Sequence, residues 1–497
     1  MGSFRRLLVA HREQLYRLME EETSKSRWEA MTGDFMPLLA SCRWHERHAR
    51  RLLRPRRLGG RPIWELGQRH AIHRRPRGHV AIIATWNYPT QLVGIQLIQA
   101  LVAGNTVVVK PSENAPRTQR YLLRLAVMAG LPEGTLRWTE VTREAGHALL
   151  KDNTFDHVIF TGSTTVGREI AKSLATSMTT STLELSGRDS AFVLADADPK
   201  LAAKSIWTAV VMNGGQTCMA PRRILVEEPI YRAFLDALSA FAGSARPRTL
   251  ISSAAAGHVF GLAKEAVECG ARSLSGVIEQ PAGPRIRPLA IVDCPEDAGL
   301  VQGDHFGPVT AVVPVRDLAH AMRIHRQCDQ HLAVSIYTRD ARRVGVLKND
   351  LIATTITIND TVIPTGHPAA SIGGSGASGW GESRGREGLL AMTNPVHVTR
   401  TSRWLRPEVL NPSAKMEQWM DRLITWLYGG RMRDAQRVVI DDDAGTDRFT
   451  TSHDTQEEVN DLTLAGPARN GRAATPERNG LHPTSRPQAA ASRRTLE

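Results

Sequence analysis

Cys218 has a sequence setting that suits a nucleophile. It stands in the segment Asn213-Gly-Gly-Gln-Thr-Cys-Met-Ala-Pro221, with paired glycines before it and a proline after it. Glycines allow a tight backbone bend and proline ends regular structure, so this thiol could be presented to a substrate carbonyl. A cysteine near glycines is more often a small buried residue, and the segment alone does not establish a nucleophile.

Two further residues have the types of a general base and an oxyanion donor. Glu184 is flanked by leucines at the end of an apolar strand expected at residues 181–185. Burial raises the pKa of a carboxyl group, and a raised pKa suits a base that works near neutral pH. Pairing with an unidentified arginine or backbone amide is the alternative. Asn87 follows an apolar strand expected at residues 79–85, where its amide could bind an oxyanion or simply stabilise a turn.

Two other segments suit a dinucleotide. The run Phe160-Thr-Gly-Ser-Thr-Thr-Val-Gly167 follows a predicted strand and opens a helix. Its glycines permit close approach of a phosphate, and a helix N-terminus favours the negative charge. The spacing differs from GxGxxG, the ordinary Rossmann fingerprint. Lys110-Pro-Ser-Glu113 ends another predicted strand, where an ammonium and a carboxylate could meet ribose hydroxyls.

Taken in order, these motifs resemble the aldehyde dehydrogenase superfamily. WNYP, KPSE, FTGSxxVG, LELSG and GQTC lie within a resemblance that runs from about residue 5 to residue 400. Glu184 precedes Cys218 by 34 residues, which looks like the family's usual spacing of base and nucleophile. WNYP and the short N-terminal region make the chain look closest to the class 3 branch, which includes fatty and medium-chain aldehyde enzymes.

The resemblance implies NAD(P)-dependent oxidation of an aldehyde to a carboxylic acid. Cys218 would attack the carbonyl, the Asn87 side chain and the Cys218 backbone N–H would hold the oxyanion, and Glu184 would activate water to hydrolyse the thioester. Glu113 near the ribose 2′-hydroxyl favours NAD over NADP, although this branch often accepts both. No metal is expected. The residues expected to contact the cofactor are Trp86, Lys110, Ser112, Glu113, Gly162, Ser163, Gly167, Leu185, Asp304 and Phe306.

Some positions depart from the family pattern. Asp304 stands where the family has the glutamate that holds the nicotinamide ribose, and it is one methylene shorter. Ser186 replaces a glycine beside the cofactor, where any need for a positive φ would make the change costly. These changes keep two other readings open: an acylating relative that passes the thioester to coenzyme A or phosphate, and a catalytically weakened homologue that acts as a binding or scaffold protein. The retained Glu184 argues against the first, and the intact nucleophile, base and amide argue against the second.

The order of the expected elements predicts an α/β fold. Helical spacing covers residues 3–57, and short apolar runs then alternate with helical segments, as in parallel sheets covered by helices. With the resemblance, this predicts an aldehyde dehydrogenase-like fold with two parallel-sheet α/β domains and a small oligomerisation element. The expected divisions are a cofactor-binding domain at 1–185, a catalytic domain at 186–365, a closing or oligomerisation segment at 366–410 with part of 366–400 returning to the first domain, an amphipathic helix at 411–440 and a disordered tail at 441–497.

Composition favours a cytoplasmic enzyme. The 497 residues include only five irregularly spaced cysteines, and no apolar run is long enough to span a membrane. The net charge of +13 is concentrated between Arg43 and Arg77, which hold 12 arginines. We favour a solvated surface over a nucleic-acid or membrane partner for this stretch, since charge runs alone are weak signals. Peripheral membrane contact through the C-terminal helix is the alternative and would imply a lipophilic aldehyde. The resemblance implies a homodimer that uses strands near 62–78 and 390–400.

Overall fold

The computed structural model describes residues 1–60, 62, 65, 67–151, 154–276, 278–402 and 411–429. The chain divides into two compact units, residues 1–407 and residues 408–497. The tail predicted at 441–497, and the last part of the helix predicted at 411–440, lie outside the described residues.

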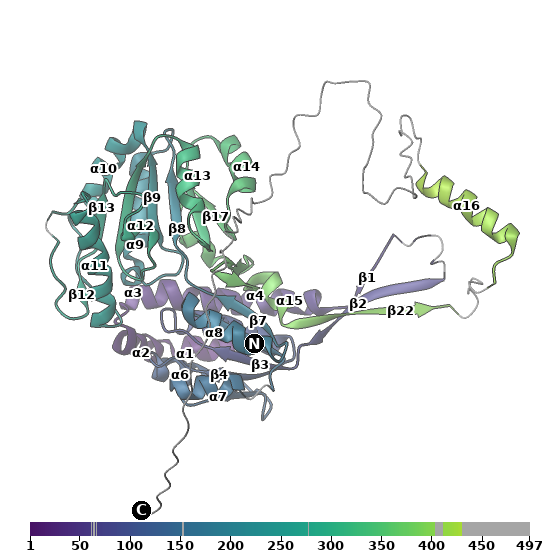
Figure 1. The fold of residues 1–497 in the computed structure, drawn as a ribbon. Helices are drawn as coiled ribbons and strands as arrows, with labels where there is room; N and C mark the ends of the chain where they lie inside the picture. The colour runs from purple at the N-terminus through teal and green to yellow at the C-terminus, as the bar shows by residue number, and fades with distance from the viewer. Residues whose placement is uncertain are drawn as a thin grey trace, which may run out of the picture. The chain divides into compact units, whose positions relative to one another are not determined.

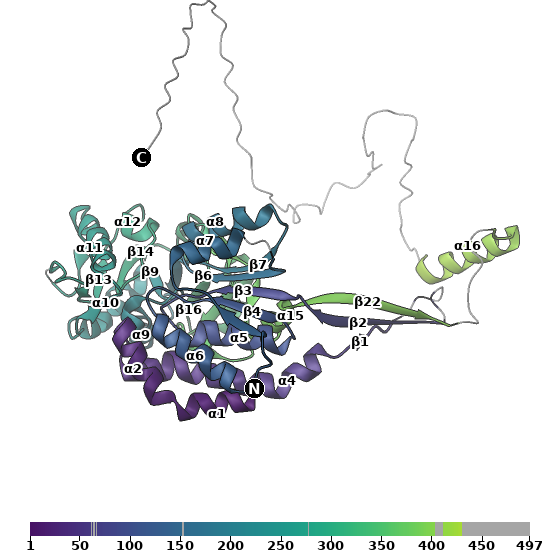
Figure 2. The ribbon, with the colours of Figure 1, turned by 90° about the horizontal axis from the view of Figure 1, so that it is seen from below.

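The first sheet has five parallel strands and one antiparallel edge strand, in the order β20-β7-β6-β3-β4-β5. Figure 2 shows α5 and α6 on one face of this sheet and α7 and α8 on the other. Along β3, Val80 and Ile82 join one apolar cluster while Ala81 and Ile83 join another, as the alternation of a strand buried on both faces requires. The elements are β3 (His79–Ile83), α5 (Gln91–Val102), β4 (Thr106–Lys110), α6 (Pro116–Met128), β5 (Leu136–Trp138), α7 (Arg143–Lys151), β6 (His157–Thr161), α8 (Thr164–Ala175), β7 (Thr180–Glu184) and β20 (Gly379–Trp380).

The second sheet has seven strands in the order β11-β13-β14-β9-β8-β16-β17, all parallel except β11. Its central strands β8 and β9 are buried along their whole length, and the neighbouring β14 has the nearly continuous apolar sequence that such burial favours. The strands are β8 (Asp189–Val193), β9 (Pro221–Glu227), β11 (Arg272–Ser273), β13 (Leu289–Val292), β14 (Val309–Val315), β16 (Ala333–Tyr337) and β17 (Thr355–Ile358). The helices are α9 (Pro199–Val211), η3 (Met212–Gly215), α10 (Glu228–Ala242), α11 (Ser253–Glu268), α12 (Gly299–Gln302), α13 (Leu318–Arg326) and α14 (Ala341–Asp350), some of which are labelled around the sheet in Figure 1. The predicted α/β fold with two parallel sheets is confirmed.

The N-terminal helices pack below α5 and α6 in the view of Figure 2. They are α1 (Gly2–Ala10), α2 (Arg12–Thr23), α3 (Arg27–Glu29), the π-helical turn η1 (Ala30–Phe35) and α4 (Met36–Leu53). α5 is buried around nearly its whole circumference because it lies between the sheet and these helices, which fits a sequence whose only polar side chains are three glutamines. The helical expectation for residues 3–57 was wrong at its end, where Arg56–Arg57 form the short strand β1.

An antiparallel sheet, β1-β2-β22, projects from the body (Figure 1). β2 (Gln68–Pro76) pairs along its whole length with β22 (Thr393–Thr401), so two segments more than 300 residues apart lie side by side. The remaining short elements are β10 (Arg248–Thr249) with β12 (Arg285–Ile286), β15 (Gln330–His331) with β19 (Ser375–Gly376), β18 (Ile372–Gly373) with β21 (Glu382–Ser383), η4 (Ile363–Gly366) and α15 (Gly385–Ala391).

The second unit contains the helix α16 (Ala414–Tyr428). Ser413 begins it, since its hydroxyl accepts from the backbone N–H of Met416. Trp419, Ile424 and Trp426 are among its exposed apolar side chains. Among the described residues, no helix is both long and apolar enough to cross a membrane.

Candidate active site

Two cavities meet at Cys218. One, of about 310 Å³, is lined by Trp86, Gly162 and other residues at strand ends, and we call it the glycine-side cavity. The other, of about 380 Å³, is lined in part by the N-terminal helices, and we call it the helix-side cavity. Glu184, Cys218 and Ile372 line both. A molecule in either cavity can therefore reach the thiol from its own side.

The turn that holds Cys218 requires its glycines. Gly214 and Gly215 have φ of +63° and +72°, and a Cβ on Gly215 would lie 2.2 Å from the carbonyl carbon of Gly307. The buried Arg222 side chain holds this turn through hydrogen bonds to backbone carbonyl oxygens. Its Nη1 donates to the carbonyl oxygens of Gly215 at 3.0 Å and Gly307 at 3.1 Å, and its Nη2 donates to that of Thr217 at 2.9 Å. The nucleophile loop and the loop around Gly307 are thus held together by one guanidinium.

Cys218 is partly buried at the junction of the two cavities. Burial raises its pKa to about 12, and the carboxylates of Glu184 and Asp189 act in the same direction. The charges of Arg384 and Arg222 oppose this rise. Since the thiolate is the reactive form of cysteine, this thiol is neutral at pH 7 and needs a base when it attacks.

Glu184 ends β7 in a position that suits such a base. It pairs across the sheet with Gly379 of β20, and its side chain is buried. Burial raises the pKa of its carboxyl, opposed by a hydrogen bond from Ser383 and by the charge of Arg384. Within the described residues its Oε1 has no hydrogen-bond partner, so the alternative of a fully paired glutamate does not describe this side chain.

Asn87 is buried four residues beyond the end of β3, against the nucleophile loop. Its Nδ2 donates to the carbonyl oxygen of Gln216 at 3.1 Å, and its Oδ1 accepts from the Thr85 hydroxyl at 3.2 Å. A primary amide has two N–H groups, so the contact with Gln216 leaves one for an oxyanion. The next residue, Tyr88, joins its hydroxyl to that of Thr217 at 2.6 Å. The asparagine loop and the cysteine loop are therefore directly connected.

The glycine-side cavity offers a place for a dinucleotide. Ser163 caps α8 by accepting from the N–H of Val166, so the positive end of this twelve-residue helix faces the cavity beside Gly162. A Cβ on Gly162 would lie 2.4 Å from the Phe160 ring, so any side chain at this position would have to displace that ring. Phe306 and Trp86 also line this cavity, and their rings meet edge to face with centroids 5.9 Å apart. An anion-binding helix end and two aromatic walls fit the phosphates and the ring of a nicotinamide dinucleotide.

The structure brings nine of the thirteen predicted site residues to this cavity: Trp86, Asn87, Gly162, Ser163, Glu184, Leu185, Cys218, Asp304 and Phe306. It does not bring the other four there. Lys110 and Glu113 form an ion pair with each other. The Ser112 hydroxyl accepts from the N–H of Asn114, and Gly167 lets α8 pack directly on Leu185.

The positions that depart from the family pattern differ in their consequences. Ser186 is not among the residues with positive φ, so a side chain there costs no backbone strain, and that concern was wrong. Asp304 accepts a hydrogen bond from His258 through its backbone carbonyl at 3.0 Å, and its charge raises the pKa of Arg222 against the effect of burial. His305 is buried, and neither of its ring nitrogens has a hydrogen-bond partner within the described residues.

Sequence reasoning missed a buried arginine in the wall of the helix-side cavity. Arg384 lines the helix-side cavity, and its charge acts on both Glu184 and Cys218. Its backbone has φ of +61°, and its Nη1 donates to the carbonyl oxygen of Thr365 at 3.1 Å. A non-glycine residue in this conformation is a signal of strain at a functional site. In the sequence, its only signal is its place directly before the Gly385-Arg-Glu-Gly388 pattern.

Comparison with known proteins agrees with this geometry. The model of the aldehyde dehydrogenase family matches residues 1–398. A 4,4'-diapolycopene aldehyde oxidase of a Methylomonas species is 30% identical over 412 residues, which cover 81% of this chain and 77% of that protein. A 4,4'-diapolycopene-4,4'-dial dehydrogenase of Cytobacillus firmus is 29% identical over 421 residues, covering 80% and 89%. The crystal structure of a Mycobacterium tuberculosis aldehyde dehydrogenase complexed with NAD+ superposes with a TM-score of 0.75 at 27% identity, covering 82% of this chain and 85% of that one.

Proposed function

The chain belongs to the aldehyde dehydrogenase family, which makes it an NAD(P)-dependent oxidoreductase, and on that premise we propose that it oxidises a lipophilic aldehyde to the carboxylic acid through a thioester on Cys218. The observation that carries this proposal is the junction of two cavities at Cys218 and Glu184. One cavity suits the dinucleotide and the other suits the aldehyde.

The Cys218 thiol must lose its proton as it attacks the aldehyde, because the thiolate is the nucleophile. Burial holds the pKa of this thiol high, so a base must take the proton. Glu184 lines the same junction and has a raised pKa, so it can take that proton. The sulfur then bonds to the carbonyl carbon. The Asn87 amide and the Cys218 N–H stabilise the negative oxygen of the thiohemiacetal. NAD(P), when bound, supplies the acceptor for the hydride. Loss of the hydride from the thiohemiacetal leaves a thioester on Cys218.

Hydrolysis of the thioester requires an activated water. Glu184 lies at the edge of both cavities, with one carboxylate oxygen that has no partner among the described residues. Once the proton taken from Cys218 has passed to solvent, this oxygen can accept a proton from water as the water attacks the thioester carbonyl. That proton then passes to the departing sulfur, which releases the carboxylic acid and the Cys218 thiol. The charge of Arg384 favours the ionised form of Glu184, which is the form that acts as base.

A lipophilic aldehyde fits the helix-side cavity. Trp28, Met212 and Ile363 line it, and the first and last of these are exposed apolar side chains. An apolar group at a cavity mouth favours a ligand whose apolar chain extends out of the cavity. Two of the relatives are enzymes named for aldehydes derived from diapolycopene, which supports the same class of substrate.

Cofactor reduction by the purified chain tests this function. Short, medium-chain, aromatic and polyene aldehydes are offered with NAD or NADP, beside Cys218→Ala as the control. Reduction should be fastest with the long apolar aldehydes and absent in the variant. No reduction with any aldehyde, despite measurable cofactor binding, would favour a binding or scaffold role instead.

The projecting sheet supports a homodimer. β22 is an edge strand of nine residues with mostly exposed side chains, and an edge strand presents unpaired backbone groups to another chain. Light scattering of the full chain should give the molar mass of a dimer. A monomer at micromolar concentration would contradict it.

A further inference from the structure

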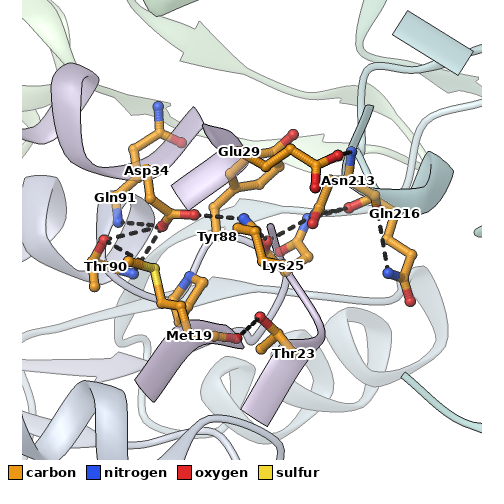
Figure 3. Close-up of polar contacts among 12 residues, drawn as sticks. Met19, Thr23, Lys25, Glu29, Asp34, Tyr88, Thr90, Gln91, Asn213 and Gln216 are labelled. Atoms are coloured by element: carbon orange, nitrogen blue, oxygen red, sulfur yellow. Dashed lines mark hydrogen bonds and ion pairs between the residues drawn. The ribbon is translucent and has the colours of Figure 1, made fainter. Parts of the chain in front are cut away.

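Lys25 is a buried cation that no sequence motif marks. It follows α2, and its side chain is fully buried, as is that of its partner Asp34. Its ammonium donates to Asp34 Oδ2 at 2.5 Å and to the backbone carbonyl of Asn87 at 2.8 Å, and it lies 4.0 Å from the centre of the Tyr88 ring. Figure 3 shows this arrangement. A buried ammonium is stable only when its donors are occupied, and here a carboxylate, a carbonyl and an aromatic face surround it.

The same ion pair holds the other end of the asparagine loop. Asp34 Oδ1 accepts from the backbone N–H groups of Thr90 and Gln91, at 3.0 and 3.1 Å, and from the Thr90 hydroxyl at 3.1 Å. These groups stand at the beginning of α5, as Figure 3 shows. The loop from Asn87 to Gln91 is therefore bound by Lys25 at its start and by Asp34 at its end.

The carbonyl oxygen of Asn87 also connects to the cysteine loop. The Nδ2 of Asn213 donates to it at 2.9 Å and to the carbonyl oxygen of Gln216 at 3.1 Å. That same Gln216 carbonyl accepts from the Asn87 side-chain amide. From the N-terminal side, Glu29 accepts from the backbone N–H of Asn213 at 3.1 Å (Figure 3). The first 35 residues thus hold both loops whose spacing decides where the Asn87 amide lies relative to Cys218.

We propose that Lys25 is a positioning residue for the oxyanion hole, which fixes the Asn87 peptide, and through it the Asn87 amide, against the nucleophile loop. The proposal rests on the proposed function, because it assigns the Asn87 amide to the oxyanion. Misplacement of a catalytic group by about 1 Å costs on the order of 100-fold in rate. Loss of an entire oxyanion donor costs about 10²–10³-fold. Loss of Lys25 should therefore cost less than loss of Asn87 itself.

The variants are chosen so that a folded protein remains. Lys25→Met alone leaves Asp34 buried and unpaired, so the double variant Lys25→Met/Asp34→Asn removes both charges together. Lys25→Arg keeps the charge and should rescue part of the activity. Arg27→Met is the matched control, because Arg27 lies two residues away and pairs with Glu13 on the surface. The thermal unfolding midpoint of each variant checks that it is folded.

A double-mutant cycle with Asn87→Ala tests the proposal. The readouts are kcat and KM for the aldehyde, and hydrolysis of an activated aryl ester, which needs the same oxyanion hole but no cofactor. In the wild-type background, Lys25→Met/Asp34→Asn should lower kcat and ester hydrolysis by about 10- to 100-fold with little change in KM. In the Asn87→Ala background the same change should have little further effect.

The outcomes separate the two proposals. If the effects of the two changes multiply, Lys25 does not act through Asn87 and the positioning role is wrong. A loss confined to the unfolding midpoint, with kcat unchanged, would overturn it as well. If the wild-type chain oxidises no aldehyde but hydrolyses the ester with this pattern, the proposed oxidation fails while the positioning role stands.

Discussion

The two cavities that meet at Cys218 are built in different ways. The glycine-side cavity is lined by residues that follow strand ends, such as Trp86 after β3, Gly162 after β6 and Leu185 after β7. The carboxyl ends of parallel strands share one edge of a sheet, so the topology alone brings these residues together. The helix-side cavity is assembled from Trp28, Met212, Ile363 and other residues scattered over the chain, and only tertiary packing brings them together.

This difference separates two kinds of specificity. The glycine-side cavity depends on backbone conformation at glycines and on a helix terminus, which suits a constant ligand such as a dinucleotide. The helix-side cavity depends on individual side chains, which can vary while the sheet stays the same. Changes at the junction should therefore stop the reaction, and changes on either side should affect one ligand only.

Cys218→Ala removes the group common to both cavities and should have the largest effect. Aldehyde oxidation should fall by at least about 10⁴-fold, because no other group at the junction can form the thioester. Cofactor affinity, measured by fluorescence quenching, should stay within a few fold. Cys269→Ala is the matched control, since this cysteine is exposed and lies outside both cavities. Activity that survives in Cys218→Ala would show that the nucleophile is another residue.

Glu184→Gln should lower steady-state turnover by about 10²–10⁴-fold, since the thioester would lack a base to activate water. The first turnover should still occur, because loss of this charge lowers the Cys218 pKa and the thiol can give its proton to solvent, although more slowly than to Glu184. It should yield one reduced cofactor per active site, measured by stopped flow. Removing this carboxylate also removes a charge that raises the Cys218 pKa, so alkylation by iodoacetamide at pH 8 should become faster. Glu268→Gln, on the exposed face of α11, is the control. Unchanged steady-state turnover would mean that water is activated elsewhere.

Arg384→Gln should shift the pH dependence of the junction. The guanidinium lowers the pKa of both Cys218 and Glu184, so its removal raises both. A higher thiol pKa means less thiolate at a given pH, and alkylation of Cys218 should require a pH about one unit higher, a tenfold slower rate at pH 8. Glutamine keeps a donor for the Thr365 carbonyl. Exposed Arg232→Gln should leave the profile in place, and a shift of Arg384→Gln toward lower pH would contradict the account.

Ile363→Asn should have the smallest effect, confined to the helix-side cavity. Ile363 is half exposed, so the loss of apolar contact should raise KM for a long aldehyde by about fivefold. Its KM for a short aldehyde and the Kd for the cofactor should not change. Gly162→Ala is the counterpart on the other side, where a Cβ would displace the Phe160 ring and raise the cofactor Kd by about tenfold. If either change affected both ligands equally, the division of the two cavities would be wrong.

The same contrast explains how far the sequence could predict this molecule. Asn87, Glu184 and Cys218 each lie beside a recognisable strand or turn signal, and the parallel topology brings the first two to one sheet edge. Cys218 precedes β9 of the second sheet and meets them where the two cavities join. Lys25 offered no such signal, because its contact with Asn87 spans 62 residues and depends on the packing of α2 against α6 and η1. Arg384 was missed for the same reason. Lys110 and Glu113 form an ion pair with each other and do not line the glycine-side cavity. Their part in binding the cofactor therefore stays a prediction.

The most direct test of a thioester on Cys218 is the intact mass of Glu184→Gln after one turnover with an aldehyde and NAD. A thioester on Cys218 should add the mass of the aldehyde less two hydrogens, located on Cys218 by peptide mapping. A gain equal to the whole aldehyde would mean that oxidation does not follow attack. No gain at Cys218, in a variant that still reduces one cofactor per site, would contradict the covalent mechanism.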